Sequence, residues 1–183
     1  MPAGSLNHPT FPLVKAAFPD RPLKATEYRD NATLIVEPGD LHEVLRFLRQ
    51  DEGCRYDFLS DITAVDYLGY PAPAPGRFGV VYVLVSTETG SRFLVKTHLD
   101  PTIDTSGIDE DPALVLDSAC DLWAGAEWLE REVFDMFGIR FRNHPDLRRI
   151  LTWKDFPAHP LRKDYPLRGR GERENYQTIE REE

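Results

Sequence analysis

The stretch FGVVYVLVSTETGSRFLVKTHL, from Phe78 to Leu99, holds two runs of β-branched and aromatic residues separated by a turn at Thr87–Gly90. These residue types favour strands, and so short a connection between two strands favours an antiparallel hairpin. In the second run, successive side chains fall on two faces, with Phe93 on one and Lys96 and His98 on the other. The alternation therefore predicts that His98 is an outward-facing strand residue rather than a ligand.

The residues before the hairpin predict two more β segments and a helix. Thr33–Glu37 (TLIVE) has the composition of a short strand closed by a Pro-Gly turn, and a second β-rich stretch covers Tyr56–Tyr67. Between them, leucine and valine recur at helical spacing, and Asp40 is placed to cap a helix that reaches Gln50. A proline-rich loop at Tyr70–Gly76 then leads into the hairpin.

After an acidic stretch, the sequence predicts a longer helix. The residues SACD at Ser118–Asp121 have the form of a capping box, which predicts that the helix begins there and that Cys120 is a buried small hydrophobe within it. Gly138 is placed as the C′ residue that ends the helix. Its apolar stripe at helical spacing consists of Leu122, Ala126, Leu129, Val133 and Phe137. Strands in one sheet with helices covering a face predict a two-layer α+β domain with a mixed or antiparallel sheet.

The chain changes character beyond this helix. Ile139–Phe141 alternates like a strand, and Pro145 can begin a short helical turn with one apolar face. That face consists of Leu147, Ile150 and Leu151. From Thr152 onward, prolines forbid a continuous helix while large apolar groups recur, and a disordered tail would contain fewer of them. We therefore predict an α+β domain at residues 1–151, whose signature helix and loop span 119–151, and an extended partner-binding C-terminal arm at 152–183.

The composition indicates a soluble protein with unevenly distributed charge. Of 183 residues, 41% are hydrophobic, and no apolar run approaches the roughly 20 residues of a membrane-spanning helix. The N-terminal sequence lacks the layout of a secretory signal, so we expect a cytoplasmic protein. The net charge is -9, yet residues 140–173 hold ten Lys or Arg against four acids. A basic C-terminal segment on an acidic body predicts a protein partner that carries acidic patches.

The two cysteines, Cys54 and Cys120, lie far apart in the sequence. This usage favours a reducing compartment over a disulfide framework. Two thiolates also fall short of the four that hold an ordinary iron–sulfur cluster. We therefore expect no cofactor in this chain.

The stretch EREVFDMFGIRFRNHPDLRRIL, Glu130–Leu151, concentrates acids, a histidine and arginines, as a catalytic or metal site would. Its candidate metal ligands are Glu130, Glu132, Asp135, His144 and Asp146. Glu130 and Glu132 lie about 200° apart on a helix, so they cannot face one ion together. Neither an HExxH motif nor a cysteine pair at ligand spacing is present. We therefore expect no metal site, and a free-standing metal-dependent enzyme is only a remote alternative.

Catalysis and nucleic-acid binding are also disfavoured. Glu127, Arg131 and Asp135 lie four residues apart with alternating sign, which predicts ion pairs along one helix face rather than an acid–base pair. Aspartates interrupt the basic and aromatic stretch that follows, and the net charge opposes binding to phosphates. Arginine and aromatic side chains are instead the types that protein interfaces favour. The residues thus predict a non-catalytic subunit.

These motifs resemble a known family. EWLEREVFDMFGIRFRNHPDLRRIL, followed by HPLRKDYPL at His159–Leu167, is similar to the 30-kDa or C-type subunit of proton-pumping NADH:quinone oxidoreductase, respiratory complex I. YDFLSDITAVDYL at Tyr56–Leu68 and the two hairpin strands support the resemblance, which covers roughly residues 53–168. The sequence departs from the family pattern at Glu127, where an Asn is expected, and in the long acidic lead-in IDEDPALVLDSACDLW.

The resemblance implies a structural subunit in the peripheral arm of a respiratory-chain translocase. In such a complex, FMN and iron–sulfur clusters of other subunits carry electrons from NADH to quinone, and proton translocation is coupled to this transfer. The implied partners are subunits of the D (49-kDa), B and I types. The implied location is the cytoplasmic side of the bacterial cell membrane, as a peripheral protein. The alternative is the equivalent subunit of a ferredoxin- or F420H2-dependent quinone oxidoreductase or of a membrane-bound hydrogenase.

Position by position, the resemblance assigns partner-interface roles to residues of the helix, the loop and the arm. These are Glu130, Arg131, Glu132, Asp135, His144, Asp146, Arg148, Arg149, Trp153, Arg162, Lys163, Asp164 and Tyr165. We therefore predict a hetero-oligomer without nucleic acid and without direct membrane insertion.

Overall fold

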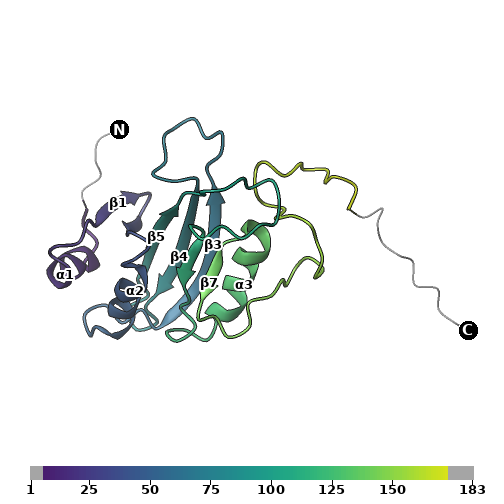
Figure 1. The fold of residues 1–183 in the computed structure, drawn as a ribbon. Coiled ribbons are helices and arrows are strands. Elements are labelled where there is room, and N and C mark those ends of the chain that lie inside the picture. The colour runs from purple at the N-terminus through teal and green to yellow at the C-terminus, as the bar shows by residue number, and fades with distance from the viewer. Residues whose placement is uncertain (1–5, 173–183) are drawn as a thin grey trace, which may run out of the picture.

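The computed structural model describes residues 6–172, which are built around an open five-stranded sheet (Figure 1). The strand order is β1-β2-β5-β4-β3, and neighbours run antiparallel except for the parallel pair β2 and β5. These strands are β1 (Lys24–Tyr28), β2 (Asn31–Ile35), β3 (Phe58–Asp66), β4 (Phe78–Val85) and β5 (Arg92–Leu99). The remaining elements are the parallel pair β6 (Val115–Asp117) and β7 (Arg140–Arg142) and the helices α1 (Thr10–Ala17), α2 (Leu41–Gln50) and α3 (Ala126–Phe137). The predicted α+β class with a mixed sheet is confirmed.

One face of the sheet carries the core. Along β5, Phe93 and Val95 are fully buried, whereas Lys96 and His98 are only half-buried on the opposite face. Helices α2 and α3 lie on the buried side of the sheet (Figure 1). The β4–β5 hairpin pairs in continuous antiparallel register from Phe78 to Val85. The predicted hairpin and the outward position of His98 are therefore confirmed.

Helix α2 has the predicted length and the predicted N-cap residue, but the side-chain capping bond does not form. Asp40 precedes the helix and makes no side-chain capping bond. Its carboxylate is paired with the guanidinium of Arg21, which follows α1 in the chain. Asp40 therefore stands at the predicted N-cap position, but its carboxylate bonds Arg21 instead of an N–H group of the helix.

Helix α3 begins at Ala126, one residue after Gly125, and not at the predicted capping box. The Ser118 hydroxyl and the Ala119 backbone N–H both donate to the buried carboxylate of Glu130, each at 2.7 Å. The Ser118 hydroxyl therefore bonds a side chain of α3, and it accepts the N–H of Cys120 at 3.1 Å in the turn before the helix rather than an N–H group of α3. Cys120 consequently lies in a turn before α3 and is partly exposed, so its predicted burial within a helix is wrong.

The end of α3 is as predicted. Gly138 has a left-handed φ of 73° and its N–H donates to the carbonyl of Phe134 at 2.8 Å, and β7 follows as the predicted short strand. The helical turn predicted at Pro145 does not form, and Leu151 is 63% exposed rather than part of a shared apolar face. Residues 152–171 contain no helix or strand, and the predicted arm residues 173–183 lie outside the described residues. Within residues 6–172, every helix is too short or too polar to span a membrane.

Candidate functional site at the junction of helix α3 and the C-terminal arm

The C-terminal arm, by which we mean residues 152–172, packs against the end of α3. An α-helix leaves its last four carbonyl groups without partners inside the helix. In α3 each of these carbonyl groups has a donor. Gly138 N–H donates to the carbonyl of Phe134 (2.8 Å), His159 Nδ1 to that of Asp135 (2.9 Å), Leu161 N–H to that of Met136 (3.1 Å) and Arg162 Nε to that of Phe137 (2.7 Å). Three of these donors belong to the arm, so the arm serves as the C-terminal cap of the helix.

Gly138 allows the arm to approach this closely. A β-carbon at Gly138 would lie 2.7 Å from the imidazole ring of His159 and closer still to the Arg162 guanidinium. The left-handed φ of 73° is also a conformation that residues other than glycine adopt only at a cost in free energy. Glycine is therefore required here for both its backbone conformation and its small size.

The Asp135 carboxylate, fully buried on α3, holds the segment that leads into the arm. Its Oδ2 accepts the backbone N–H groups of Ile150, Leu151 and Thr152 at 3.0, 2.7 and 2.8 Å. Its Oδ1 accepts a hydrogen bond from Arg149 at 2.7 Å. Burial alone would raise the pKa of this carboxyl group, but the bonds from Thr152 and Arg149 outweigh it and lower the pKa. Asp135 is therefore a buried anion with its acceptor positions occupied.

Arg131 bonds the loop after β7 rather than neighbouring acids on the helix. Its Nε and Nη2 donate to the carbonyl oxygens of Arg148 and Arg149 at 3.0 and 3.2 Å. The predicted ladder of ion pairs from Glu127 through Arg131 to Asp135 is therefore wrong. The reason is burial, because main-chain carbonyls shielded from water need donors, and a guanidinium can serve two of them.

A second ionic cluster fixes the far part of the arm. Arg77 Nη2 donates to carboxylate oxygens of Asp66 and Asp164, both at 2.8 Å, and the Lys163 backbone N–H donates to Asp66 at 2.9 Å. The Asp66 side chain is 1% exposed, so these bonds are shielded from water. Arg162 adds a bond from Nη1 to the Thr105 carbonyl at 2.9 Å. The arm is thus attached to α3, to the end of β3, and to the loops before β4 and after β5.

His159 is buried in the junction and neutral. Burial lowers its pKa to about 4, the bond to the Asp135 carbonyl opposes this shift, and the nearby charge of Arg162 adds to it. The proton of the neutral ring is on Nδ1, because that nitrogen faces a carbonyl oxygen. The neutral ring therefore donates to the end of α3 without bringing a further charge into the interior.

Glu130 and His144 meet in the interior beside Cys120. His144 Nε2 lies 4.0 Å from Glu130 Oε2, and the Cys120 thiol lies 3.7 Å from the same oxygen. These ligand-type atoms lie within 4.8 Å of one another. However, His144 Nε2 already donates to the Glu127 carbonyl at 3.0 Å, and burial raises the pKa of the Cys120 thiol to about 11, which disfavours a thiolate ligand. The geometry therefore fits a hydrogen-bonded cluster that joins α3 to its neighbouring loops.

Other residues of the predicted interface lie at the surface. Arg148 and Asp146 are exposed and pair with each other at 2.8 Å. Glu132 and Lys163 are also exposed. Internal bonds are made by the side chains of Glu130, Arg131, Asp135, His144, Arg149, Arg162 and Asp164, whereas the side chains of these four residues lie at the surface. The contact of all these residues with a partner stays a prediction.

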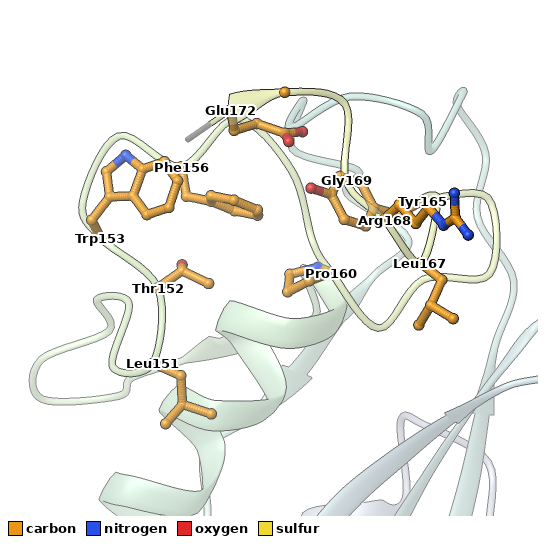
Figure 2. A pocket seen from close by; sticks show the side chains of 11 residues that line it. Leu151, Thr152, Trp153, Phe156, Pro160, Tyr165, Leu167, Arg168, Gly169 and Glu172 are labelled. Carbon is orange, nitrogen blue, oxygen red and sulfur yellow. The ribbon is translucent and has the colours of Figure 1, made fainter. Parts of the chain in front are cut away.

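The outer side of the arm forms a hollow of about 730 Å³ (Figure 2). Trp153 and Phe156 pack edge to face on one side, with ring centroids 4.6 Å apart, and Tyr165 and Leu167 lie on the opposite side. Leu167 is fully exposed, and Leu151 beside the hollow is 63% exposed. Apolar groups exposed in one place are typical of protein interfaces. The arm is thus held by ionic bonds on its inner side and presents apolar surface on its outer side.

Three residues that complete the junction were not indicated by the sequence. Arg77 and Thr105 lie in loops, and their partner Asp164 is far away in the chain, so no local spacing connects them. His159 stands in the HPLRKDYPL motif, but nothing in that motif predicts a bond to the carbonyl of Asp135. A polar residue beside prolines in an otherwise apolar segment was the available signal for His159.

Several known proteins are similar to this chain in sequence. Residues 34–171 match the family described as respiratory-chain NADH dehydrogenase, 30 Kd subunit. The NADH-quinone oxidoreductase C subunit of Citrifermentans bemidjiense is 47% identical over 156 residues, which are 85% of this chain and 87% of the relative. NADH-quinone oxidoreductase subunit 5 of Thermus thermophilus is 51% identical over 117 residues, which are 61% of this chain and 52% of the relative.

Two solved structures are similar in fold. A trypsin-resistant fragment (1–134) of Nqo5 superposes with a TM-score of 0.61 and 32% identity, covering 75% of this chain and 96% of the fragment. A chain of the archaeal membrane-bound sulfane sulfur reductase, a respiratory membrane complex, superposes with a TM-score of 0.66 at 23% identity, covering 94% of each chain. The second likeness concerns the fold alone.

Proposed function

The chain belongs to the family of 30-kDa subunits of respiratory-chain NADH dehydrogenase, and from this we propose that it is the C-type assembly subunit of a proton-pumping NADH:quinone oxidoreductase. The observation that carries the proposal is the extent of the match, because residues 34–171 include most of the sheet, α3 and nearly all of the described arm. Relatives that share this region bear the name of that subunit. The chain is a subunit of the enzyme complex, and its own role is structural.

We infer that the arm is the main docking segment. The buried bonds of Asp135, Arg149 and Arg162 fix the course of the arm. The exposed side chains of Leu161 (54%) and Leu167 (104%) then supply apolar area for a partner. On this proposal, the ionic residues of the interface act by positioning the arm, and the apolar residues make the contact.

The partners and cofactors follow as part of the proposal. We propose that subunits of the D (49-kDa), B and I types surround the arm, and that FMN and the iron–sulfur clusters lie in partner subunits. The two cysteines of this chain, one of them buried, support this assignment because an ordinary cluster takes four thiolates. The proposed location is the cytoplasmic side of the bacterial cell membrane, where the complex holds the chain as a peripheral protein.

Affinity purification of the tagged chain from native membranes tests the proposal. We expect the NADH-oxidising subunits and the D-, B- and I-type subunits to elute with it. The variant Leu161→Ser/Leu167→Ser should lower the yield of the co-eluting subunits roughly tenfold, since a few buried apolar anchors carry most interface energy. The variant Leu6→Ser/Leu13→Ser, which alters exposed leucines in and beside α1, is the matched control.

The outcomes separate the alternatives. Co-elution of ferredoxin- or F420H2-linked subunits, or of hydrogenase subunits, would assign the chain to a related complex. Equal yields from the arm variant and the leucine control at α1 would contradict docking through the arm. NADH oxidation by the purified chain alone would contradict the structural role.

A further inference from the structure

The face of the sheet that points away from α2 and α3 is an open surface with an apolar centre. We call it the open face, and it is centred on Val81, Val83 and Leu94. Val83 lies beside Leu94 in the register of β4 and β5, and all three residues are only half-buried. At the edge strand β3, Phe58 and Val65 of the same face are 53% and 40% exposed. A sheet normally buries an apolar face against a second layer.

The charges around this centre are mainly basic. Lys24 stands opposite Ile35, Lys96 opposite Val81 and Arg92 opposite Val85, so all three cations belong to the open face. Asp61, opposite Val83, is the acid among the strand residues of this face. The whole chain carries a net charge of -9, so a basic surface is contrary to the average of the molecule. A partner that carries both carboxylates and apolar groups fits this surface. A lysine-rich partner would be repelled by the cations, and a phosphate-rich partner would leave the apolar centre uncovered.

One end of the open face also holds a polar atom without a partner. His98 Nδ1 is buried and makes no hydrogen bond within the described residues. Its ring lies 5.8 Å from that of Tyr67, and Lys96 donates to the Tyr67 hydroxyl. These side chains pack over Gly79, where a β-carbon would meet Tyr67 and Lys96 at 2.9 Å. A buried polar atom normally has a partner, so a water or a group of another chain is expected at this end of the face.

We propose that the open face docks an acidic amphipathic helix of another subunit, with apolar side chains on Val81, Val83 and Leu94 and carboxylates beside Lys24, Arg92 and Lys96. The docked helix would cover this face of the sheet, just as α2 and α3 cover the opposite face. A second copy of this chain does not offer such a helix, because α1 carries no acid in its first turn and the apolar side of α2 is buried in the core. Helix α3 carries acids, but Trp128 is its single exposed large apolar side chain. The proposal rests on the proposed function only in placing the helix within the same complex.

Lysine labelling of the intact complex tests this directly. The lysines of the chain are Lys15, Lys24, Lys96, Lys154 and Lys163. Acetylation with an N-hydroxysuccinimide ester, followed by mass spectrometry, compares each rate in the purified complex with the rate in the isolated chain. We expect Lys24 and Lys96 to react roughly tenfold more slowly in the complex, because a buried interface excludes the reagent and water alike. Lys15, on α1, is the internal control.

The outcomes distinguish this proposal from docking through the arm. Unchanged rates at Lys24 and Lys96 overturn the open-face proposal, even if Lys154 and Lys163 of the arm are protected. Protection at Lys24 and Lys96 with unprotected arm lysines contradicts the arm and leaves the open face standing. Protection that depends on the concentration of the isolated chain identifies a second copy and overturns the proposal.

A crosslink and a variant identify the chemistry of the occupant. A carbodiimide, which joins amines to adjacent carboxylates, should link Lys24 or Lys96 to Asp or Glu of another subunit, and links confined to this chain overturn the acidic helix. The variant Val81→Asp places a carboxylate opposite Lys96, where the fold can pair it. It should lower incorporation into the complex roughly tenfold through repulsion of the partner's acids. Leu6→Asp adds the same charge at an exposed residue beside α1, away from both the open face and the arm, and equal losses from both variants contradict the proposal.

Discussion

Arg162 Nε donates a hydrogen bond of 2.7 Å to the carbonyl oxygen of Phe137, the residue at which α3 ends. A cation is favoured at the C-terminal end of a helix by the helix dipole, and a buried carbonyl without a donor is costly. The two residues lie 25 positions apart in the sequence, so the bond joins segments that local preference does not connect. The position of the arm therefore depends on the conformation of the chain at the C-terminal end of α3.

Substitution of Gly138 should release the arm. In Gly138→Ala, a left-handed φ and contact with His159 and Arg162 together should lower the free energy of unfolding by roughly 2–3 kcal/mol. Urea denaturation followed by circular dichroism measures this loss, and trypsin should cut the arm faster. Gly125→Ala is the matched control, because nothing lies within 4 Å of a β-carbon there and its φ is -65°. Equal stabilities of the two variants would contradict the close approach.

The geometry of the guanidinium at position 162 should matter beyond its charge. Arg162→Lys keeps a cation but loses the simultaneous bonds to the carbonyls of Phe137 and Thr105. We expect a loss of roughly 2 kcal/mol in unfolding free energy, since buried acceptors are left unpaired. Arg142→Lys changes an arginine whose side chain is 64% exposed and should have little effect. An equally small effect at Arg162 would show that the bonds contribute little.

The buried pair Asp135–Arg149 should be strongly coupled. A double-mutant cycle with Asp135→Asn and Arg149→Met should give a coupling of roughly 1–3 kcal/mol in unfolding free energy, because the two groups touch at 2.7 Å with little exposure to water. The exposed pair Asp117–Arg142 provides the comparison, and there we expect less than about 0.5 kcal/mol. Additive losses at Asp135 and Arg149 would mean that each residue acts through its backbone contacts alone.

The parts of the fold that were predictable depend on local periodicity and on glycine. The β4–β5 hairpin follows from alternation, α2 from its apolar stripe, and the end of α3 from Gly138. The β1–β2 hairpin carries no such signal, because its turn places Arg29 and Asp30 at positive φ where glycine or asparagine is usual. The start of α3 was not predictable in this way. Ser118 and Ala119, within the predicted cap, bond the carboxylate of Glu130, and nothing in the four-residue capping motif indicates that partner.

The candidate site was predictable in its residues and not in its bonds. The acids and arginines that lie close together in the sequence also lie close together in the structure, so the cluster itself is recognisable. Which group bonds which is decided by burial. Arg131 donates to two carbonyl oxygens 17 and 18 residues away, and Asp135 accepts from three N–H groups 15 to 17 residues away. Neither side chain forms an ion pair with its neighbours on the helix. Spacing along one helix contains no information on such partners.

Acid should loosen the arm before it unfolds the domain. The folded-state pKa of His159 is lowered to about 4 from a usual value of 6.5, so the fold favours the neutral ring. As the pH falls below 6.5, the undocked chain takes up a proton at His159 that the docked chain does not. Stability is therefore present above pH 6.5 and is lost progressively down to about pH 4, by up to roughly 3 kcal/mol. The lowered pKa of Asp135 acts at lower pH, because its unfolded value is already 3.8.

Amide hydrogen exchange in the arm, measured by mass spectrometry between pH 7.5 and 4.5 with correction for intrinsic rates, tests this expectation. Peptides spanning Leu161 and Arg162 should lose protection as the pH falls through 6. In His159→Asn, the amide N–H can replace the Nδ1 donor without taking up a proton, so arm protection should be weaker at pH 7.5 but nearly independent of pH. His98 also has a lowered pKa but lies on the open face, so His98→Asn should retain the acid response of the arm. A wild-type arm whose protection stays constant across this range would contradict the buried neutral imidazole.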